Sequence, residues 1–380
     1  MMRRASVERV MVVAAALATT LVWSAAPVAA LSSGPVVVEA GLGRALDVMD
    51  ELAGDATRSE LKKQKRTTRP RPGLPIQLGR DGRLTMLLIG SDWRAESGGE
   101  RLDVLMVATI DPTTGRAAVL SIPRDMSGIP LAGGANSGGT RVNSIYYIRH
   151  RDPDLPHGAV DEKGLTRFTD DIATFLGTRI DYWAYVRFGT FAAVVNHLGG
   201  VFVDVDEEVL DSSYHHGSSR GIWFPRSDHY RLKGDPKCKP KPRKCRSALV
   251  YARSRKGTMG TRYNSDYTRA ERQQDIVLAS VKRVLEDHGA GIVLLGLLGD
   301  VRKHVVTNMP TTAEAAAQLY ALLDGVRLRD SDMRVMAPPT WAVSVPGYAI
   351  RPRVDEIRAW VDKAFYKVRP DAAGRRDQGG

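Results

Sequence analysis

The sequence of 380 residues is 43% hydrophobic and 26% charged, and it carries a formal net charge of +12. This composition is typical of a globular protein with one large α/β domain or two smaller ones, and it excludes disorder for most of the chain. The positive charge favours an acidic partner, but it does not separate nucleic acid, an anionic membrane surface and the phosphate groups of a smaller substrate.

The N-terminus predicts export. Arg3, Arg4 and Arg9 precede an uncharged, apolar stretch at residues 10–30. About twenty such residues are enough to cross a bilayer as a helix, with the arginines on the cytoplasmic side. The small residues at 27–30 also suit cleavage of a signal peptide. Both alternatives, a membrane anchor and a cleaved signal, place the rest of the chain outside the cytoplasm.

The two cysteines agree with that location. Cys238 and Cys245 flank a loop rich in lysine and proline, and a short-range disulfide between them suits an oxidising compartment. Two free thiols are the alternative. A zinc site would need more ligands, and no histidine stands nearby at a ligand spacing.

The chain divides into five segments by composition. A basic cytoplasmic N-terminus at residues 1–9 and the anchor or signal segment at 10–30 come first. Residues 31–80 contain lysines and arginines broken by prolines, which predicts an extracytoplasmic stalk. One folded domain is expected at 81–368, followed by a disordered tail at 369–380.

Apolar runs and helical spacings predict alternating strands and helices in the domain. Strands are expected at residues 85–89, 104–110, 117–122, 182–186 and 201–205. Helices are expected at 166–176, 191–198, 247–255, 266–287, 312–323 and 354–366. A short turn at 111–115 makes the second and third strands a hairpin, so we expect an α/β fold with a mixed central β-sheet and helices on both faces. The polar segment 211–246 is expected to be a long surface excursion.

Four segments concentrate aspartate and arginine where strands end or helices begin, and loops that carry function are displayed at such positions. They lie at 90–92, 101–103 and 121–125, with a fourth formed by 251–255 and 266–273. Guanidinium groups suit phosphate oxygens, and carboxylates suit magnesium or manganese. Together the segments predict a diphosphate site with a divalent cation, although each one alone is as easily explained by a surface ion pair or a turn.

On the expected helix at 266–287, Asp266, Arg269 and Gln273 share one face because they stand at positions i, i+3 and i+7. Arg272 is rotated away from that face and is the weaker candidate. A structural alternative is that Asp266 caps the helix and pairs with Arg269.

Eight separated segments stand in the order of one family's motifs. They are LLIGSD at 87–92, RLD at 101–103, LSIPRD at 120–125, RVN at 141–143, IDY at 180–182, LGGV at 198–201, ALVYARSR at 248–255 and DYTRAERQQ at 266–274. In combination they resemble the LytR-CpsA-Psr family, and the resemblance covers residues 84–285.

The resemblance implies a mixed-sheet catalytic domain, here at 81–368, behind an N-terminal membrane helix. It implies transfer of a glycopolymer, of the teichoic acid, capsule or arabinogalactan type, from a polyprenyl-diphosphate carrier to peptidoglycan, with release of polyprenyl phosphate. The implied partners are the membrane, the donor glycolipid and the peptidoglycan acceptor, with no nucleic acid. The protein would be a single-pass membrane protein with its domain outside, or secreted after signal cleavage.

The family's sites carry over residue by residue. Asp92 and Asp103 would hold Mg²⁺ (or Mn²⁺). The residues that would bind the diphosphate are Arg101, Arg124, Arg253, Arg255, Arg269 and Gln273. Arg124 is also the expected catalytic residue, and Asp125 and Asp266 are the candidates for a general base.

Two departures from the family pattern flank the expected acceptor side: a longer loop at 256–265, and the Cys238–Cys245 loop in place of a short link. His215 and His216 are expected to be solvated within the polar excursion.

Three other functions compete with a transferase. A diphosphatase would use the same residues with water as the acceptor. A non-catalytic polyprenyl-phosphate-binding protein would keep the arginines but would have no need of Asp92 and Asp103. A DNA-binding regulator is disfavoured because the domain is exported and because no nucleic-acid-binding module is evident in the sequence.

Overall fold

The computed structural model describes residues 76–79, 81–93, 100–216, 219–254, 266–286, 305–310, 333–337, 340–345 and 348–366, together with Ala315, Gln318 and Leu322. The predicted apolar segment at 10–30, most of the stalk and the predicted tail lie outside these residues. None of the helices in the described ranges is long and apolar enough to span a bilayer.

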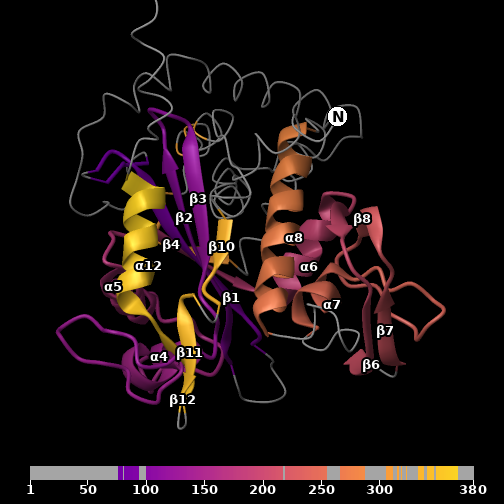
Figure 1. Ribbon diagram of the computed structural model, residues 1–380, viewed down its shortest axis with the longest axis horizontal. Coiled ribbons are helices and arrows are strands. Elements are labelled where there is room, and N and C mark those ends of the chain that lie inside the picture. Colours follow the sequence, from indigo (N-terminus) through magenta and orange to yellow (C-terminus); the bar gives the residue numbers. More distant parts are fainter. Residues whose placement is uncertain are drawn as a thin grey trace, which may run out of the picture.

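A mixed sheet lies at the centre of the described residues (Figure 1). Its six strands are, in spatial order, β10 (Met333–Val335), β3 (Arg116–Ser121), β2 (Leu102–Asp111), β1 (Leu84–Ser91), β4 (Tyr182–Arg187) and β9 (Val305–Thr307). β1 and β4 are parallel, as are β3 and β10, and the other neighbours are antiparallel. The predicted hairpin of β2 and β3 is confirmed, and its turn closes where the Gly115 amide donates to the Asp111 carbonyl over 2.8 Å.

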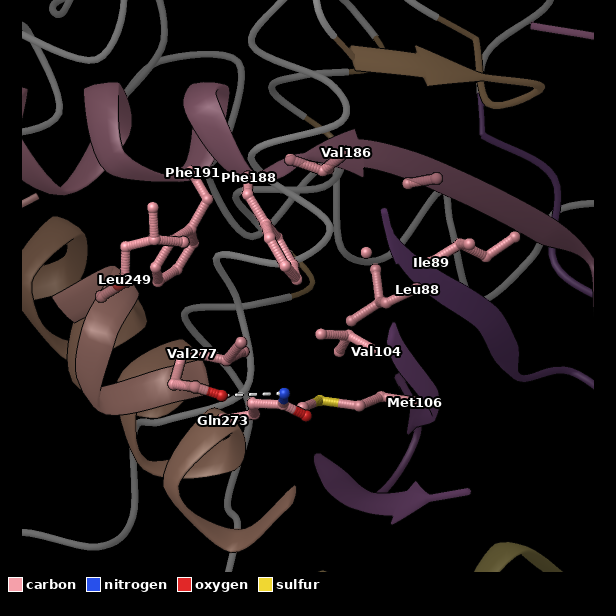
Figure 2. Close-up of a pocket in the computed structure, with 14 residues that line it drawn as sticks. Leu88, Ile89, Val104, Met106, Val186, Phe188, Phe191, Leu249, Gln273 and Val277 are labelled. Atoms are coloured by element: carbon pink, nitrogen blue, oxygen red, sulfur yellow. Dashed lines mark hydrogen bonds between the residues drawn. The ribbon is translucent and has the colours of Figure 1, made fainter. Parts of the chain in front are cut away.

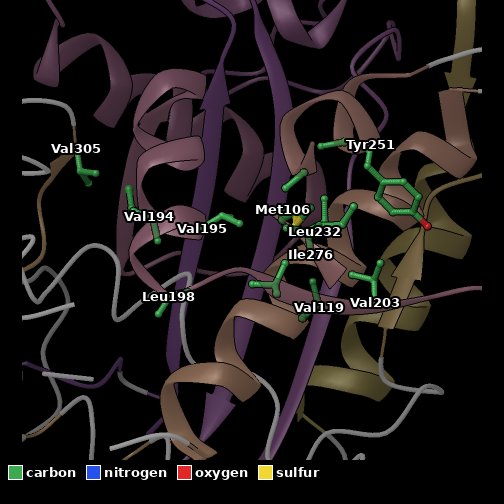
Figure 3. Close-up of a cluster of buried hydrophobic side chains, with 14 of the residues drawn as sticks. Met106, Val119, Val194, Val195, Leu198, Val203, Leu232, Tyr251, Ile276 and Val305 are labelled. Atoms are coloured by element: carbon green, nitrogen blue, oxygen red, sulfur yellow. The ribbon is translucent and has the colours of Figure 1, made fainter. Parts of the chain in front are cut away.

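Helices cover both faces of the sheet, as the alternating pattern predicted (Figure 1). One face carries α5 (Glu162–Leu176) and α12 (Val354–Val361), with η4 (Asp362–Tyr366), α4 (Val142–Ile145) and η2 (Tyr146–His150) packed on the same side. The other face carries α6 (Phe188–His197), α7 (Ala248–Arg253) and α8 (Asp266–Glu286). Alternate strand residues therefore enter different cores: Leu87 packs on the α5 side, whereas Met106 packs beside Val195 and Ile276 (Figure 3).

α5 begins four residues earlier than the apolar spacing predicted. The Asp161 carboxylate caps the helix by accepting a 2.8 Å hydrogen bond from the Gly164 amide. Such a cap satisfies a backbone donor that has no partner within the helix. The helix ends at Gly177, whose φ of 65° is readily adopted by glycine.

The prediction of a surface excursion at 211–246 is wrong. β6 (Val209–His216) pairs with β7 (Ser219–Phe224), and β8 (Ser227–Leu232) pairs with β5 (Val201–Val205). Apolar side chains of these strands are buried in the core: Val209, Ile222, Phe224, Tyr230 and Leu232. In β6 the buried residue that follows Val209 is Asp211, so the two-residue alternation of apolar residues that marks a strand with one buried face stops after one position.

Cys238 and Cys245, for which the sequence favoured a disulfide, are joined by one, and both are buried. A further two-stranded sheet of β11 (Ala342–Val345) and β12 (Tyr348–Pro352) was not predicted.

Candidate active site

A polar cavity of about 430 Å³ lies at one edge of the central sheet. Its lining residues are Asp92, Arg101, Asp103, Arg124, Phe188, Tyr214, His215, Arg253, Arg269 and Gln273. Seven of these were candidates from the sequence: both expected metal ligands and five of the six expected diphosphate-binding residues. The sixth, Arg255, lies outside the described residues, as does the side chain of Asp266.

The strand topology brings the first group together. Because β2 is antiparallel to both β1 and β3, the end of β1, the start of β2 and the end of β3 meet at the same edge. Asp92 follows β1 and is fixed to Arg101: its amide donates to the Arg101 carbonyl over 3.1 Å, and its carboxylate accepts from the Arg101 amide over 2.8 Å. Asp103 stands at the start of β2, and Arg124 follows β3.

Arg124 is held by carboxylates on two sides. Its guanidinium donates to Asp103 over 2.7 Å and lies 3.5 Å from Asp125, which also pairs with Arg141 over 3.2 Å. The Arg124 side chain is only 9% exposed, so these pairs lie in a partly desolvated environment. Asp125 is not among the residues that line the cavity. Its contacts fit the positioning of Arg124 better than the general-base role expected from the sequence.

Buried polar contacts fix α7 against α8. Ser247 caps α7 by accepting from the Val250 amide. The completely buried guanidinium of Arg272 donates to the Tyr251 carbonyl over 3.0 Å and also to the Ser254 carbonyl. Arg272 therefore joins the two helices, in agreement with its position off the face that Arg269 and Gln273 share.

Gln273 completes this helix contact. Its side-chain amide donates to the Ala252 carbonyl over 3.1 Å, and in this arrangement Arg253 and Arg269 both line the cavity. The Arg253 guanidinium lies 5.2 Å from the centre of the Phe188 ring, within the range of a cation–π contact.

An apolar cavity of about 100 Å³, drawn in Figure 2, shares lining residues with the polar one. It is lined by residues from β1, β2, β4, α6, α7 and α8: Leu88, Ile89, Gly90, Val104, Met106, Ala184, Val186, Phe188, Phe191, Leu249, Ala252, Gln273, Val277 and Ser280. Phe188 and Gln273 line both cavities, so they form a common wall. These residues could not be named from the sequence, because their apolar pattern is that of any inward face.

Tyr214 and His215 also line the polar cavity, and the sequence did not single them out as site residues. They lie near the tip of the hairpin formed by β6 and β7, where His215 pairs in register with Arg220. The excursion expected here is thus a hairpin, whereas His215 itself is exposed, as expected. The apolar run at 222–224 was the available signal for this hairpin.

Comparison with known proteins identifies the family. A model of the LytR_cpsA_psr family matches residues 49–335. The chain belongs to this family. The mixed-sheet α/β architecture expected from the resemblance is thereby confirmed, and a solved structure agrees with it. Protein gbs0355 from Streptococcus agalactiae matches with a TM-score of 0.53 and 17% identity, over 78% of this chain and 96% of that one, which shows the fold alone.

Curated relatives of this LytR_cpsA_psr protein include enzymes. Polyisoprenyl-teichoic acid–peptidoglycan teichoic acid transferase TagV of Bacillus subtilis (strain 168) is 28% identical over 236 residues, which are 62% of this chain and 52% of that protein. The corresponding transferase TagU of Bacillus mycoides is 28% identical over 230 residues, 60% of each chain. The matches thus span between half and three-fifths of these relatives' own lengths.

The donor set of this LytR_cpsA_psr site fits a magnesium ion that is shared with a phosphorylated substrate. Within the described ranges, no three side chains of His, Cys, Asp or Glu are grouped closely enough to hold a metal alone. Magnesium usually takes one or two carboxylates and completes its shell with substrate phosphates and water. Asp92 and Asp103 supply that number of carboxylates on the cavity wall.

Proposed function

We propose that this LytR_cpsA_psr protein transfers a glycopolymer from a polyprenyl-diphosphate carrier to peptidoglycan and releases polyprenyl phosphate. The observation that carries the proposal is the wall that the arginine-rich cavity and the apolar cavity share at Phe188 and Gln273. A molecule with a diphosphate head and a hydrocarbon tail contacts both cavities at once. The names of the relatives, which pair a polyisoprenyl-linked polymer with peptidoglycan, support it.

In this reaction an acceptor hydroxyl oxygen attacks the phosphorus next to the glycopolymer. A new phosphorus–oxygen bond forms while the bond to the bridging oxygen breaks, and polyprenyl phosphate leaves with that electron pair. The hydroxyl proton passes to a base, for which Asp266 is the stronger candidate because Asp125 is bound by two arginines. The reaction needs no covalent enzyme intermediate.

The cavity residues lower the barrier by electrostatics. Negative charge builds on the phosphoryl oxygens and the leaving group, and charges placed beforehand stabilise it without reorganisation. The lining holds four arginines, Arg101, Arg124, Arg253 and Arg269, against two aspartates, an excess of two positive charges that favours a diphosphate. Asp92 and Asp103 would hold Mg²⁺ (or Mn²⁺), which supplies Lewis-acid stabilisation of the phosphoryl oxygens when bound.

The proposal places the domain outside the cytoplasm. The apolar segment at 10–30, preceded by arginines, would anchor it as a single-pass membrane protein or direct its secretion before cleavage. The lipid donor then reaches the apolar cavity from the adjacent membrane.

Turnover of a synthetic polyprenyl-diphosphate glycolipid by the full chain tests the proposal. The reaction is run with and without Mg²⁺ and with and without a peptidoglycan oligomer. Metal-dependent release of polyprenyl phosphate, coupled to a new glycan linkage, is the expected result, and Arg124→Ala should abolish it. Asp92→Asn with Asp103→Asn separates an enzyme from a binding protein, because the double variant should still bind donor but lose turnover.

Two results would replace the proposed function. Release of lipid without a linkage, across several acceptors, would make the protein a diphosphatase. Tight binding of donor without release under every condition would make it a polyprenyl-phosphate-binding protein.

A further inference from the structure

The segment at residues 237–246 forms a strongly basic loop, called the basic loop below. It contains six basic residues and no acidic one: Lys237, Lys239, Lys241, Arg243, Lys244 and Arg246. All six are exposed. A solvated linker would explain such a run in an extended chain, but this run belongs to the folded part of the protein.

Several contacts fix the basic loop to β7 and β8. The disulfide joins its two ends at buried cysteines. The Cys245 amide donates to the Trp223 carbonyl over 2.8 Å, and the Tyr230 hydroxyl donates to the Cys245 carbonyl over 2.6 Å. Lys241 lies 4.9 Å from the Trp223 ring centre and pairs with Glu208 over 3.1 Å. The loop is therefore a preorganised surface, which lowers the entropy lost on binding.

Four of the six cations make no side-chain ion pair, hydrogen bond or ring contact within the described residues: Lys237, Lys239, Arg243 and Lys244. Like charges held together by a disulfide repel one another and destabilise the folded state. A polyanion bound across them would remove that repulsion and release the counterions that they attract. The arrangement thus has the charge expected of a polyanion-binding surface.

The basic loop is continuous with the polar cavity through the hairpin of β6 and β7. Gly221 of β7 lies against the loop: a Cβ atom placed on this glycine would be only 3.6 Å from the side chain of Pro240. The preceding residue, Arg220, is exposed and pairs in register with His215, which lines the cavity. Arg220 and Trp223 are about 10 Å apart along the strand, at about 3.3 Å per residue. In Figure 1 the segment between β8 and α7 projects beside β7 at the right edge.

We propose that the basic loop binds the polymer part of the donor, a chain with repeating phosphodiester or carboxylate groups, where that chain leaves the diphosphate cavity. This inference rests on the proposed function and adds a second donor-binding surface to it. An anionic bilayer is the weaker partner for the loop. Interfacial membrane binding combines basic with apolar side chains, and the exposed large apolar residues of the described chain, Ile148, Phe202 and Tyr366, are all outside the loop.

The first test measures binding of lipid-free poly(glycerol phosphate) to the full chain at 50 and 200 mM salt. The loop variant carries glutamine at the four unpaired positions: Lys237, Lys239, Arg243 and Lys244. A control variant loses the same charge at exposed positions elsewhere: Arg149, Lys163, Arg353 and Lys363. With a salt slope of about 0.7 per contact, as for single-stranded polyanions, four contacts give about a 50-fold loss of wild-type affinity over this range. The loop variant should lack this dependence, and the control should retain it.

A second test compares donors in the transferase reaction. The loop variant should raise the KM of an anionic-polymer donor while leaving its kcat, and the KM of an uncharged-polymer donor of equal length, unchanged. Equal polymer binding by the loop and control variants would overturn the inference. So would loss of binding to phosphatidylglycerol vesicles with polymer binding intact, which would assign the loop to the membrane.

The two tests separate this inference from the proposed function. Binding of lipid-free polymer needs no turnover, so a missing transferase activity with loop-dependent polymer binding would reject the reaction alone. Thermal unfolding of both variants identifies any loss of fold.

Discussion

Filling the apolar cavity should weaken donor binding without destabilising the protein. Ala252 lies on α7, is 7% exposed and lines the cavity of about 100 Å³. Ala252→Leu adds three carbon atoms to that space. At about 0.8 kcal/mol for each buried CH₂, excluding three carbons of a bound hydrocarbon chain costs about 2.4 kcal/mol, which corresponds to about a 60-fold rise in Kd. Cavity-filling changes commonly stabilise a fold by about 0.5–2 kcal/mol, so unfolding should not explain the loss.

The assay compares two donors that share a diphosphate and glycan but differ in lipid length. The Kd of a long-chain donor should rise in Ala252→Leu, whereas that of a donor with a severely shortened lipid should not change. Ala279→Leu is the matched control, since Ala279 lies on α8 but borders a different pocket and not the apolar cavity. An unchanged affinity of Ala252→Leu for the long-chain donor, in a folded protein, would refute the assignment of this cavity to the lipid.

Three further predictions concern single side chains. Arg124→Gln should lower kcat about 10²–10³-fold in the transferase assay, because it removes one preorganised charge; a fall below threefold would contradict this. Arg272→Met should lower the urea-derived unfolding free energy by about 3 kcal/mol, because two carbonyls lose their donor; an unchanged midpoint would count against it. Burial raises the pKa of Asp181 to about 7, so the folded state binds an extra proton between pH 4 and 7. The free energy of unfolding should therefore fall by about 4 kcal/mol as the pH rises from 4 to 7. In Asp181→Asn the free energy of unfolding should depend much less on pH over this range.

The positions of the strand-end motifs could be predicted from the sequence because a short turn determines how two neighbouring strands pair. A short turn forces β2 and β3 into a hairpin, and this puts Asp103 and Arg124 at one sheet edge. The helical period likewise predicted that Arg269 and Gln273 share one face of α8 and that Arg272 lies off that face. Both arguments need only the direction of an element and the period of its side chains.

The remaining part of the site depends on packing, which one sequence does not reveal. Val104 and Val277 line a cavity but have the same pattern as residues of a filled core. The hairpin that carries His215 was hidden because glycines and charged residues interrupt its alternation. Asp125 was one of two candidates for a general base, and its ion pairs with Arg124 and Arg141 depend on packing that the sequence does not reveal.

The wall shared by the two cavities at Phe188 and Gln273 has a consequence for product release. On the proposed reaction, the broken bond lies on the polar side of that wall, so the lipid product keeps its whole tail and one phosphate. It thereby retains the apolar contacts and part of the arginine contacts of the donor. If the protein catalyses this reaction, polyprenyl phosphate should compete with fresh donor for the site. The turnover rate should then depend on how quickly polyprenyl phosphate leaves the site for the membrane.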